Sequence, residues 1–250
     1  MSHVSGRLFG ALLLAGLALT GHATNNGQKR TDPTIDPKLV AAGFLDAHPD
    51  LLYRSRGLDR YGERKYAEAF QQFQRAALYS DKPSQAILGE MLWIGLGAPR
   101  DRATAFAWMD LAAERGYRSF VAKRDLYWSE LGDEERQLAE QQRAVLFAKY
   151  GDAFAEPRLE AILRRERLGL TGSRVGFTGN NVKILVPGLG MMDSTQFYDK
   201  KYWDPKEYRA WQDEIWMDVR IGRVDVGAVE QVHADQKEPP EAESTEGNKD

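Results

Sequence analysis

Residues 61–117 read YGERKYAEAFQQFQRAALYSDKPSQAILGEMLWIGLGAPRDRATAFAWMDLAAERGY. Within this stretch, Ala69-Phe70 recurs 36 residues later as Ala105-Phe106, and Ala76-Ala77 recurs at the same spacing as Ala112-Ala113. A fixed period in the thirties, with small residues at matched helical positions, is typical of a helical repeat. The stretch therefore predicts a chain organised around repeated pairs of helices.

The residue types in this stretch suit close helix packing. Alanines spaced three and four residues apart let helix backbones approach, and the larger Phe70, Phe73, Phe106 and Met109 fill the remaining space. Gly116 follows the last periodic residue, where a left-handed residue commonly ends a helix. Because one repeat cannot cover its own apolar face, we expect flanking helices to cap the array.

The same stretch resembles the Sel-one-like repeat, a relative of the tetratricopeptide repeat. Leu88-Gly89-Glu90-Met91-Leu92-Trp93 is similar to the family's Leu-Gly-x-x-Tyr helix, Gly95-Leu96-Gly97 to its glycine loop, and Ala112-Ala113-Glu114-Arg115-Gly116 to the end of its alanine-rich helix. The similarity fades beyond Tyr117, because the period puts Arg124-Asp125 where Leu-Gly is expected. The resemblance implies a short right-handed solenoid of antiparallel helix pairs that binds other proteins and shares no catalytic residue.

The N-terminus has the features of a secretory signal peptide. Arg7 precedes the apolar run 8–19, and Gly21 and Ala23 place small residues at a cleavage site. The run is short for a bilayer span, so an uncleaved anchor is the alternative. The chain has no Cys, which excludes a lipid-attachment cysteine, disulfides and thiolate chemistry. We expect cleavage after about Ala23 and a periplasmic or secreted bacterial protein that is not a lipoprotein.

Changes in composition divide the rest of the chain. Residues 24–37 are polar with two prolines and predict a flexible leader, whereas the acidic, Pro-containing end predicts a disordered tail. Pro157 is expected to open the last helix before the composition changes. The predicted organisation is a signal peptide at 1–23, the leader at 24–37, a helical repeat domain at 38–169, a small α+β module at 170–232 and the tail at 233–250.

The expected α+β module combines alternation, turn residues and a strong helix start. Val, Ile and Phe alternate on either side of a Gly-Asn-Asn turn, and Asp204-Pro205-Lys206-Glu207 combines an N-cap, a proline and an early acid. The predicted elements are strands at 175–177 and 182–186 joined by a turn at 179–181, a loop at 188–194, a helix from residue 204 and a third strand within 221–232.

Residue types that carry common chemistries are scarce. The net charge of −3 argues against a nucleic-acid partner. Beyond the expected signal peptide the only histidines are His48 and His233, and they form no metal-binding pair. Ser173 is one position early for a nucleophile elbow, and Gly188-Leu189-Gly190 lacks the third glycine of a dinucleotide loop. We therefore expect no catalytic residue, metal or cofactor, and no stable membrane span after signal cleavage.

Aromatic residues are dense between Phe197 and Trp216. Trp211 and Trp216 lie on one apolar stripe, so we expect them to pack onto the hairpin or the helical repeats. Other aromatic side chains have two open interpretations, which are core packing and contact with a peptide or glycan. The candidate partner-binding residues are Tyr198, Tyr202, Trp203, Trp93 and Trp108.

Two functions follow from these patterns. The first is an exported, non-enzymatic adaptor or scaffold that uses its repeats to bind a protein or peptide in the bacterial envelope. The second assigns the activity to residues 170–232, as a module that binds cell-wall glycan or has weak enzymatic activity, with the repeats as its scaffold. The repeated helices and the signal peptide favour the first function.

Overall fold

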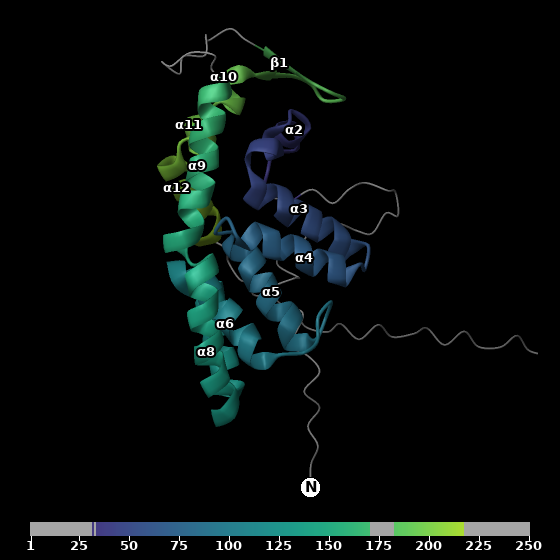
Figure 1. Ribbon diagram of the computed structural model, residues 1–250. Coiled ribbons are helices and arrows are strands. Elements are labelled where there is room, and N and C mark those ends of the chain that lie inside the picture. The colour runs from purple at the N-terminus through teal and green to yellow at the C-terminus, as the bar shows by residue number, and fades with distance from the viewer. Residues whose placement is uncertain (1–31, 33, 171–182, 218–250) are drawn as a thin grey trace, which may run out of the picture.

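The computed structural model describes residues 32, 34–170 and 183–217, and it is mainly helical, with adjacent helices packed in pairs (Figure 1). A small two-stranded hairpin lies near the C-terminal end of the described chain. The mainly helical class expected from the repeated alanines is confirmed. The expectations that lie outside the described residues are the signal peptide at 1–23, most of the leader, the strands at 175–177 and 221–232, and the tail at 233–250.

The described helices and strands follow one another in two groups. The first group comprises α2 (Pro37–Ala41), the 3-10 turn η1 (Phe44–Ala47), α3 (Pro49–Gly62), α4 (Tyr66–Ala77), α5 (Lys82–Ile94), α6 (Arg102–Ala112), η2 (Ala113–Arg115), α7 (Arg118–Glu130), α8 (Asp133–Tyr150) and α9 (Asp152–Leu170). The second comprises β1 (Lys183–Val186), β2 (Gly190–Asp193), α10 (Ser194–Phe197), α11 (Lys200–Trp203) and α12 (Pro205–Met217).

Side-chain caps set the starts of the paired helices. Asp81 Oδ2 accepts a hydrogen bond of 3.1 Å from the Ser84 amide at the start of α5. Asp101 Oδ1 accepts one of 2.9 Å from the Thr104 amide at the start of α6. Each cap satisfies a backbone donor that a helix leaves unpaired. Gly95 ends α5 in the left-handed conformation, with φ of 74°.

Helices α3 and α4 pack together, as do α5 and α6, and α8 also packs against α6. The alanines of the sequence period, including Ala69, Ala77, Ala105 and Ala112, are fully buried. At Gly89 the backbones of α5 and α6 are so close that an added Cβ would lie 2.9 Å from the Ala105 carbonyl oxygen. The small residues therefore set the spacing between paired helices.

A separate core joins the two ends of the described chain. Phe44 and Leu51 from the N-terminal side pack in one cluster with Leu163 of α9, Val186 of β1 and Trp203 of α11. The residues after α9 are therefore built onto the segment around α2 and α3. This shared packing crosses the boundary that the composition change at residue 170 predicts, because composition does not show which surfaces meet.

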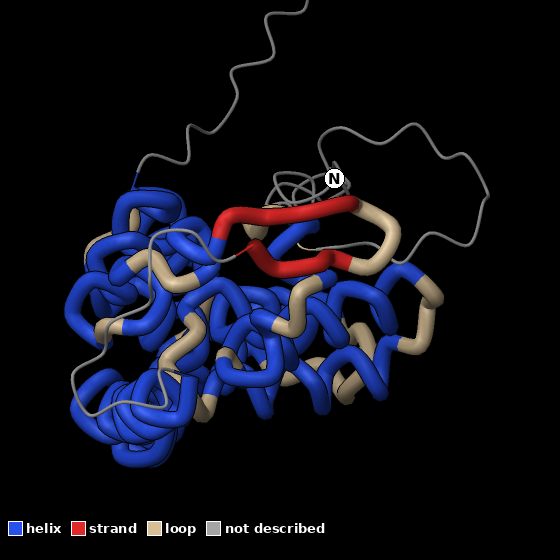
Figure 2. The backbone as a smooth tube through the Cα atoms, turned by 90° about the horizontal axis from the view of Figure 1, so that it is seen from above, coloured by secondary structure: helices blue, strands red, loops and turns tan. Residues whose placement is uncertain are grey.

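The hairpin differs from the predicted one. Strand β1 matches the predicted strand 182–186, but it pairs antiparallel with β2, so that Ile184 lies opposite Met192 and Leu185 opposite Met191. The prediction of a loop at 188–194 was wrong. Residues 187–189 form the turn between the two strands. Gly188 within the turn and Gly190 directly after it both have positive φ, which glycine adopts easily. Figure 2 shows the two strands lying over one end of the helices.

One helix boundary and the end of the leader also differ from expectation. Helix α9 begins at Asp152, and Pro157 lies inside it. The break between α8 and α9 lies at Gly151, where a Cβ would lie 2.6 Å from the Phe147 carbonyl oxygen, so a glycine is needed there. Helices α8 and α9 follow one another along one side of the molecule (Figure 1). The end of the predicted flexible leader is also structured, since Ile35 is 3% exposed.

Of the two tryptophans on the apolar stripe of α12, Trp216 packs onto the helical domain, as predicted, whereas Trp211 packs against α11. The Trp216 ring lies 5.9 Å from the ring of Phe120 in α7, measured between centroids. The Trp211 ring lies 4.9 Å from that of Tyr202 in α11. Helix α12 is thereby fixed against both the helical pairs and the short C-terminal helices, which places its buried face beside a cavity.

Candidate functional site

A cavity of about 210 Å³ lies where distant parts of the described chain meet. Its lining comes from the start of α3, the segment Tyr79–Pro83, the junction of η2 and α7, one face of α9, and α12. Apolar, aromatic and charged side chains all contribute to the lining. A concave site at the meeting point of several elements, with apolar walls and converging polar groups, is the usual place for a ligand.

Helix α12 presents a stripe of three buried residues to this cavity. Tyr208, Gln212 and Trp216 are spaced four residues apart, so they lie on one face of the helix. The start of this helix is set by Asp204, whose Oδ1 accepts hydrogen bonds from the backbone amides of Lys206 and Glu207. Among the described residues, Gln212 Nε2 and Trp216 Nε1 have no hydrogen-bond partner.

A first group of buried charges, which we call the Arg54 cluster, consists of Arg54, Asp32, Asp50 and Asp81. Arg54 Nε contacts Asp32 Oδ2 and Arg54 Nη1 contacts Asp81 Oδ1, each at 2.5 Å. Arg54 Nη2 donates to Thr34 Oγ1 at 3.1 Å. The Arg54 side chain is completely buried, so its charge depends on these carboxylates.

Asp50 belongs to this cluster and lines the cavity, but only one of its oxygens is used. Tyr208 Oη donates to Asp50 Oδ2 at 2.5 Å, whereas Asp50 Oδ1 has no partner among the described residues. Burial raises the pKa of Asp50, although the Tyr208 hydroxyl, the Arg54 charge and the backbone amides of Leu51 and Asp50 act in the opposite direction. The pKa of Tyr208 is raised well above its usual value by its own burial and by the neighbouring Asp50 charge. Asp50 thus lines the cavity with one carboxylate oxygen that has no well-aligned donor among the described residues, beside the backbone amides at the start of α3.

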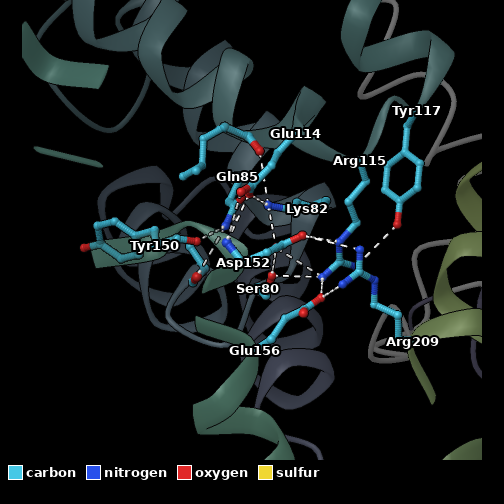
Figure 3. Close-up of polar contacts among 12 residues, drawn as sticks. Ser80, Lys82, Gln85, Glu114, Arg115, Tyr117, Tyr150, Asp152, Glu156 and Arg209 are labelled. Carbon is cyan, nitrogen blue, oxygen red and sulfur yellow. Dashed lines mark hydrogen bonds and ion pairs between the residues drawn. The ribbon is translucent and has the colours of Figure 1, made fainter. Parts of the chain in front are cut away.

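A second group of charges, the Arg115 cluster, forms another part of the cavity wall (Figure 3). It consists of Lys82, Glu114, Arg115, Asp152, Glu156, Arg209 and Asp213. Lys82 Nζ lies 2.6 Å from Glu114 Oε2 and 2.8 Å from Asp152 Oδ1. Arg115 Nε lies 2.8 Å from Asp152 Oδ2, and Arg115 Nη2 lies 2.8 Å from Glu156 Oε1. The two buried cations of this cluster each contact at least two carboxylates.

The pairing in the Arg115 cluster has two consequences. Burial alone would raise the pKa of Asp152, but the hydrogen bonds and charge of Arg115, together with Lys82, hold it well below its usual range. Ser80 is held in the left-handed region, with φ of 65°, while its hydroxyl contacts Asp152 and Arg115. Such a conformation costs a non-glycine residue about 1–2 kcal/mol. The cluster therefore holds the cavity wall in a defined shape.

His48, the one histidine among the described residues, does not line the cavity. His48 is buried, with Nδ1 2.7 Å from the Phe44 carbonyl oxygen and Nε2 2.7 Å from the Tyr202 carbonyl oxygen. Burial lowers the pKa of His48 to about 4, and a neutral ring can donate to only one of these oxygens. Within residues 32, 34–170 and 183–217, no group of three or more His, Cys, Asp or Glu side chains could hold a metal ion.

The five aromatic residues predicted as partner contacts lie away from this cavity. Trp108 and Trp203 are each 3% exposed, and the Trp203 indole donates to the Phe197 carbonyl oxygen at 2.6 Å, so their burial supports the packing interpretation. Trp93 stacks on Tyr127 with ring centroids 3.8 Å apart. Trp93, Tyr198 and Tyr202 keep partial exposure, and their contact with a peptide or glycan stays a prediction.

Sequence reasoning missed the polar residues that line the cavity. Asp50 belongs to no motif in the sequence, and Gln212 falls between aromatic residues that dominate the pattern. Asp213 belongs to no motif either, but it contacts the Tyr117 hydroxyl and lies 3.6 Å from Arg115 Nη1. The four-residue spacing of Tyr208, Gln212 and Trp216 was the available signal, and a polar residue within it marks a buried polar position.

No family model, curated protein or solved structure matches this chain. In the ranges that the structure describes, no helix is both long enough and apolar enough to cross a membrane. Function is therefore argued from the cavity and its side chains.

Proposed function

We propose that this chain is an exported, non-enzymatic adaptor that binds a protein or peptide in the bacterial envelope, with the cavity beside α12 as the docking site. One observation carries the proposal. Three residues that line the cavity, Asp50, Gln212 and Trp216, each have a buried polar atom without a partner among the described residues. An unpaired buried polar group costs about 1–3 kcal/mol. A bound peptide offers both donors and acceptors that would remove this cost.

The arrangement of the paired helices supports the repeat part of this proposal. Helices α4 and α6 begin at Tyr66 and Arg102, which are 36 residues apart, and the alanines of the sequence period are buried at matched positions. We propose that α3–α6 are two units of a right-handed solenoid of the Sel-one-like type. Solenoids of stacked helices present extended surfaces that suit protein partners.

The segment at 1–23 supports the proposed compartment. Its positive start, short apolar run and small residues at the cleavage site are typical of export signals. In the envelope, a chain without Cys must be stabilised by packing and ion pairs, and the Arg54 and Arg115 clusters supply buried ion pairs. The proposed partner is therefore an envelope protein or a peptide that reaches the envelope.

A capture experiment with matched variants tests this proposal. Residues 24–250 are immobilised as the wild type, as Gln212→Met, and as Gln141→Met, which changes an exposed glutamine of α8. An envelope extract is passed over each, and bound proteins and peptides are identified by mass spectrometry. We expect the wild type and Gln141→Met to capture the same partner, and Gln212→Met to capture about tenfold less because a buried donor is lost.

Equal capture by all three proteins would contradict the cavity as the docking site. Capture of no protein, together with sedimentation of the chain with cell-wall material, would favour the alternative of glycan binding. Thermal unfolding of each variant separates a loss of binding from a loss of fold. Replacing Gln212 removes a donor that has no partner among the described residues, so we expect its variant to unfold close to the wild-type temperature.

A further inference from the structure

We infer that the cavity selects a primary ammonium group, supplied by a peptide N-terminus or by a lysine side chain. The inference rests on the proposed function, and it names the part of the bound peptide that the cavity recognises. It stands on an unused carboxylate oxygen, an excess of buried negative charge, aromatic walls and two unused donors. Each of these belongs to described residues that line the same cavity or contact its lining.

The unused carboxylate oxygen is Asp50 Oδ1. Asp50 is 3% exposed and lines the cavity, and its other oxygen already accepts from Tyr208. A group that binds at Oδ1 must donate a hydrogen bond, and a positively charged donor gives the stronger bond. A quaternary ammonium has no N–H to donate. A guanidinium binds best to two free carboxylate oxygens, and Asp50 has only one.

The charge balance around Asp50 favours a cationic ligand. In the Arg54 cluster, three carboxylates share one guanidinium, and all three guanidinium nitrogens are engaged by Asp32, Asp81 and Thr34. In the Arg115 cluster, the four carboxylates of Glu114, Asp152, Glu156 and Asp213 face three cations. Both clusters therefore carry more carboxylates than cations. A buried negative charge needs a positive partner, which a bound ammonium would supply.

The cations that line the cavity do not cancel this attraction. Lys82, Arg115 and Arg209 each contact carboxylates of the Arg115 cluster, as Figure 3 shows for their contacts with Glu114, Asp152 and Glu156. Lys206 also lines the cavity, but its side chain is exposed, so water and salt screen its charge. The negative charge at Asp50 is buried and is screened much less.

Aromatic rings and two donors complete the site. Tyr79, Tyr117, Tyr208 and Trp216 all line the cavity, and aromatic faces attract ammonium groups. The Trp216 ring already lies beside one cation, with Arg54 Cζ 5.8 Å from its centroid. Gln212 Nε2 and Trp216 Nε1 need acceptors. A peptide supplies a carbonyl oxygen close to its terminal ammonium or to the backbone of a lysine.

Acetylation of the partner tests the inference on the wild-type protein. An envelope extract is treated with an acetylating reagent that converts primary amines to amides, and capture by immobilised residues 24–250 is compared with the untreated extract. We expect acetylation to reduce capture about tenfold or more, because a charged donor is lost. Undiminished capture would overturn the ammonium inference and leave the adaptor function standing. Capture from neither extract would instead count against the adaptor function.

Three defined peptides distinguish the two sources of the ammonium group. They are trialanine amide, its N-acetylated form, and N-acetylated Ala-Lys-Ala amide, each titrated calorimetrically into residues 24–250. Binding of trialanine amide alone assigns a peptide N-terminus, and binding of the lysine peptide assigns a side chain. N-acetylated trialanine amide has no primary ammonium group, so it should bind at least about tenfold more weakly than the tighter-binding of the other two peptides. Equal binding of all three, or binding of none, would overturn the inference.

A charge-removing variant locates the ammonium group. Asp50→Asn keeps the shape of the side chain, and Asp125→Asn on the exposed face of α7 is its control. We expect Asp50→Asn to bind the preferred peptide about tenfold or more weakly and Asp125→Asn to bind it unchanged. Wild-type affinity should also fall on acidification as Asp50 becomes protonated, with Arg54, Asp81 and Tyr208 as the groups that face it. Unchanged affinity in Asp50→Asn would overturn the assignment to this carboxylate.

Discussion

The Arg54 and Arg115 clusters both bury charge beside the same cavity, but only one of them leaves an acceptor unused. In the Arg115 cluster, both Asp152 oxygens contact cations, and Lys82 and Arg115 each contact more than one carboxylate. In the Arg54 cluster, one guanidinium serves two of three carboxylates, and Asp50 keeps one oxygen without a partner among the described residues. A saturated cluster holds structure, whereas an unsaturated one is ready for a ligand.

The positions of the clusters fit this difference. The Arg115 cluster links the start of α5, η2, the start of α9 and α12, so its ion pairs hold four elements around the cavity. The Arg54 cluster links the segment before α2 to α3 and to the cap of α5, and only Asp50 and Asp81 line the cavity. We therefore expect the Arg115 cluster and the Arg54 ion pairs to hold the fold, and Asp50 to be the member that serves binding.

The largest effect is expected from Arg54→Met. The change removes the only cation of the Arg54 cluster and leaves three buried carboxylates facing one another. Breaking a buried ion pair on one side costs about 3–5 kcal/mol of unfolding free energy. Urea denaturation measures the loss of unfolding free energy. Arg143→Met is the control, because Arg143 is 47% exposed and pairs with Asp110 on the surface. A loss as small as that of the control would show that the cluster does not depend on its cation.

Asp152→Asn should have the next largest effect, at about 2–3 kcal/mol, because Lys82 and Arg115 lose a shared charged partner. The pKa of Asp152 is lowered in the folded state, so its contribution is present above the ordinary value of 3.8 and is lost as the pH falls through the folded value. Urea denaturation across pH should show a constant gap from wild type at neutral pH that closes in acid. The fully exposed Asp133 provides a control variant, Asp133→Asn.

Local patterns predicted the fold much better than the site. The alanine period predicted the buried faces of α4 and α6. The partner strand of β1 was missed because glycines both before and after β1 permit a turn. The turn after β1 is the one observed, and it lets Met192 of β2 pack in the core. The contact between Asp50 and Tyr208 joins residues 158 apart, and no local periodicity reports such a contact.

Asp50→Asn should have an opposite and smaller effect on stability. The variant removes a buried charge that makes no direct ion pair among the described residues, and we expect it to be more stable than wild type by about 1 kcal/mol at neutral pH. The pKa of Asp50 is raised in the folded state by burial, so its contribution is favourable below 3.8 and is lost as the pH rises through the folded value. The advantage of the variant should therefore grow with pH in thermal unfolding measurements. A destabilised variant would make Asp50 a structural residue like Asp152.

The smallest effect is expected at the exposed edge of the Arg115 cluster. Arg209 contacts Glu156 and lies 3.3 Å from Asp213, but its side chain is 40% exposed. Solvent screening limits such pairs to about 0–1 kcal/mol, so Arg209→Gln should unfold within that range of wild type, and added salt should narrow the gap. A double-mutant cycle with Glu156→Gln measures the coupling. A loss as large as that of Asp152→Asn would mean that the whole cluster acts as one buried unit. A small loss would show that burial, more than the number of ion pairs, determines which members hold the wall.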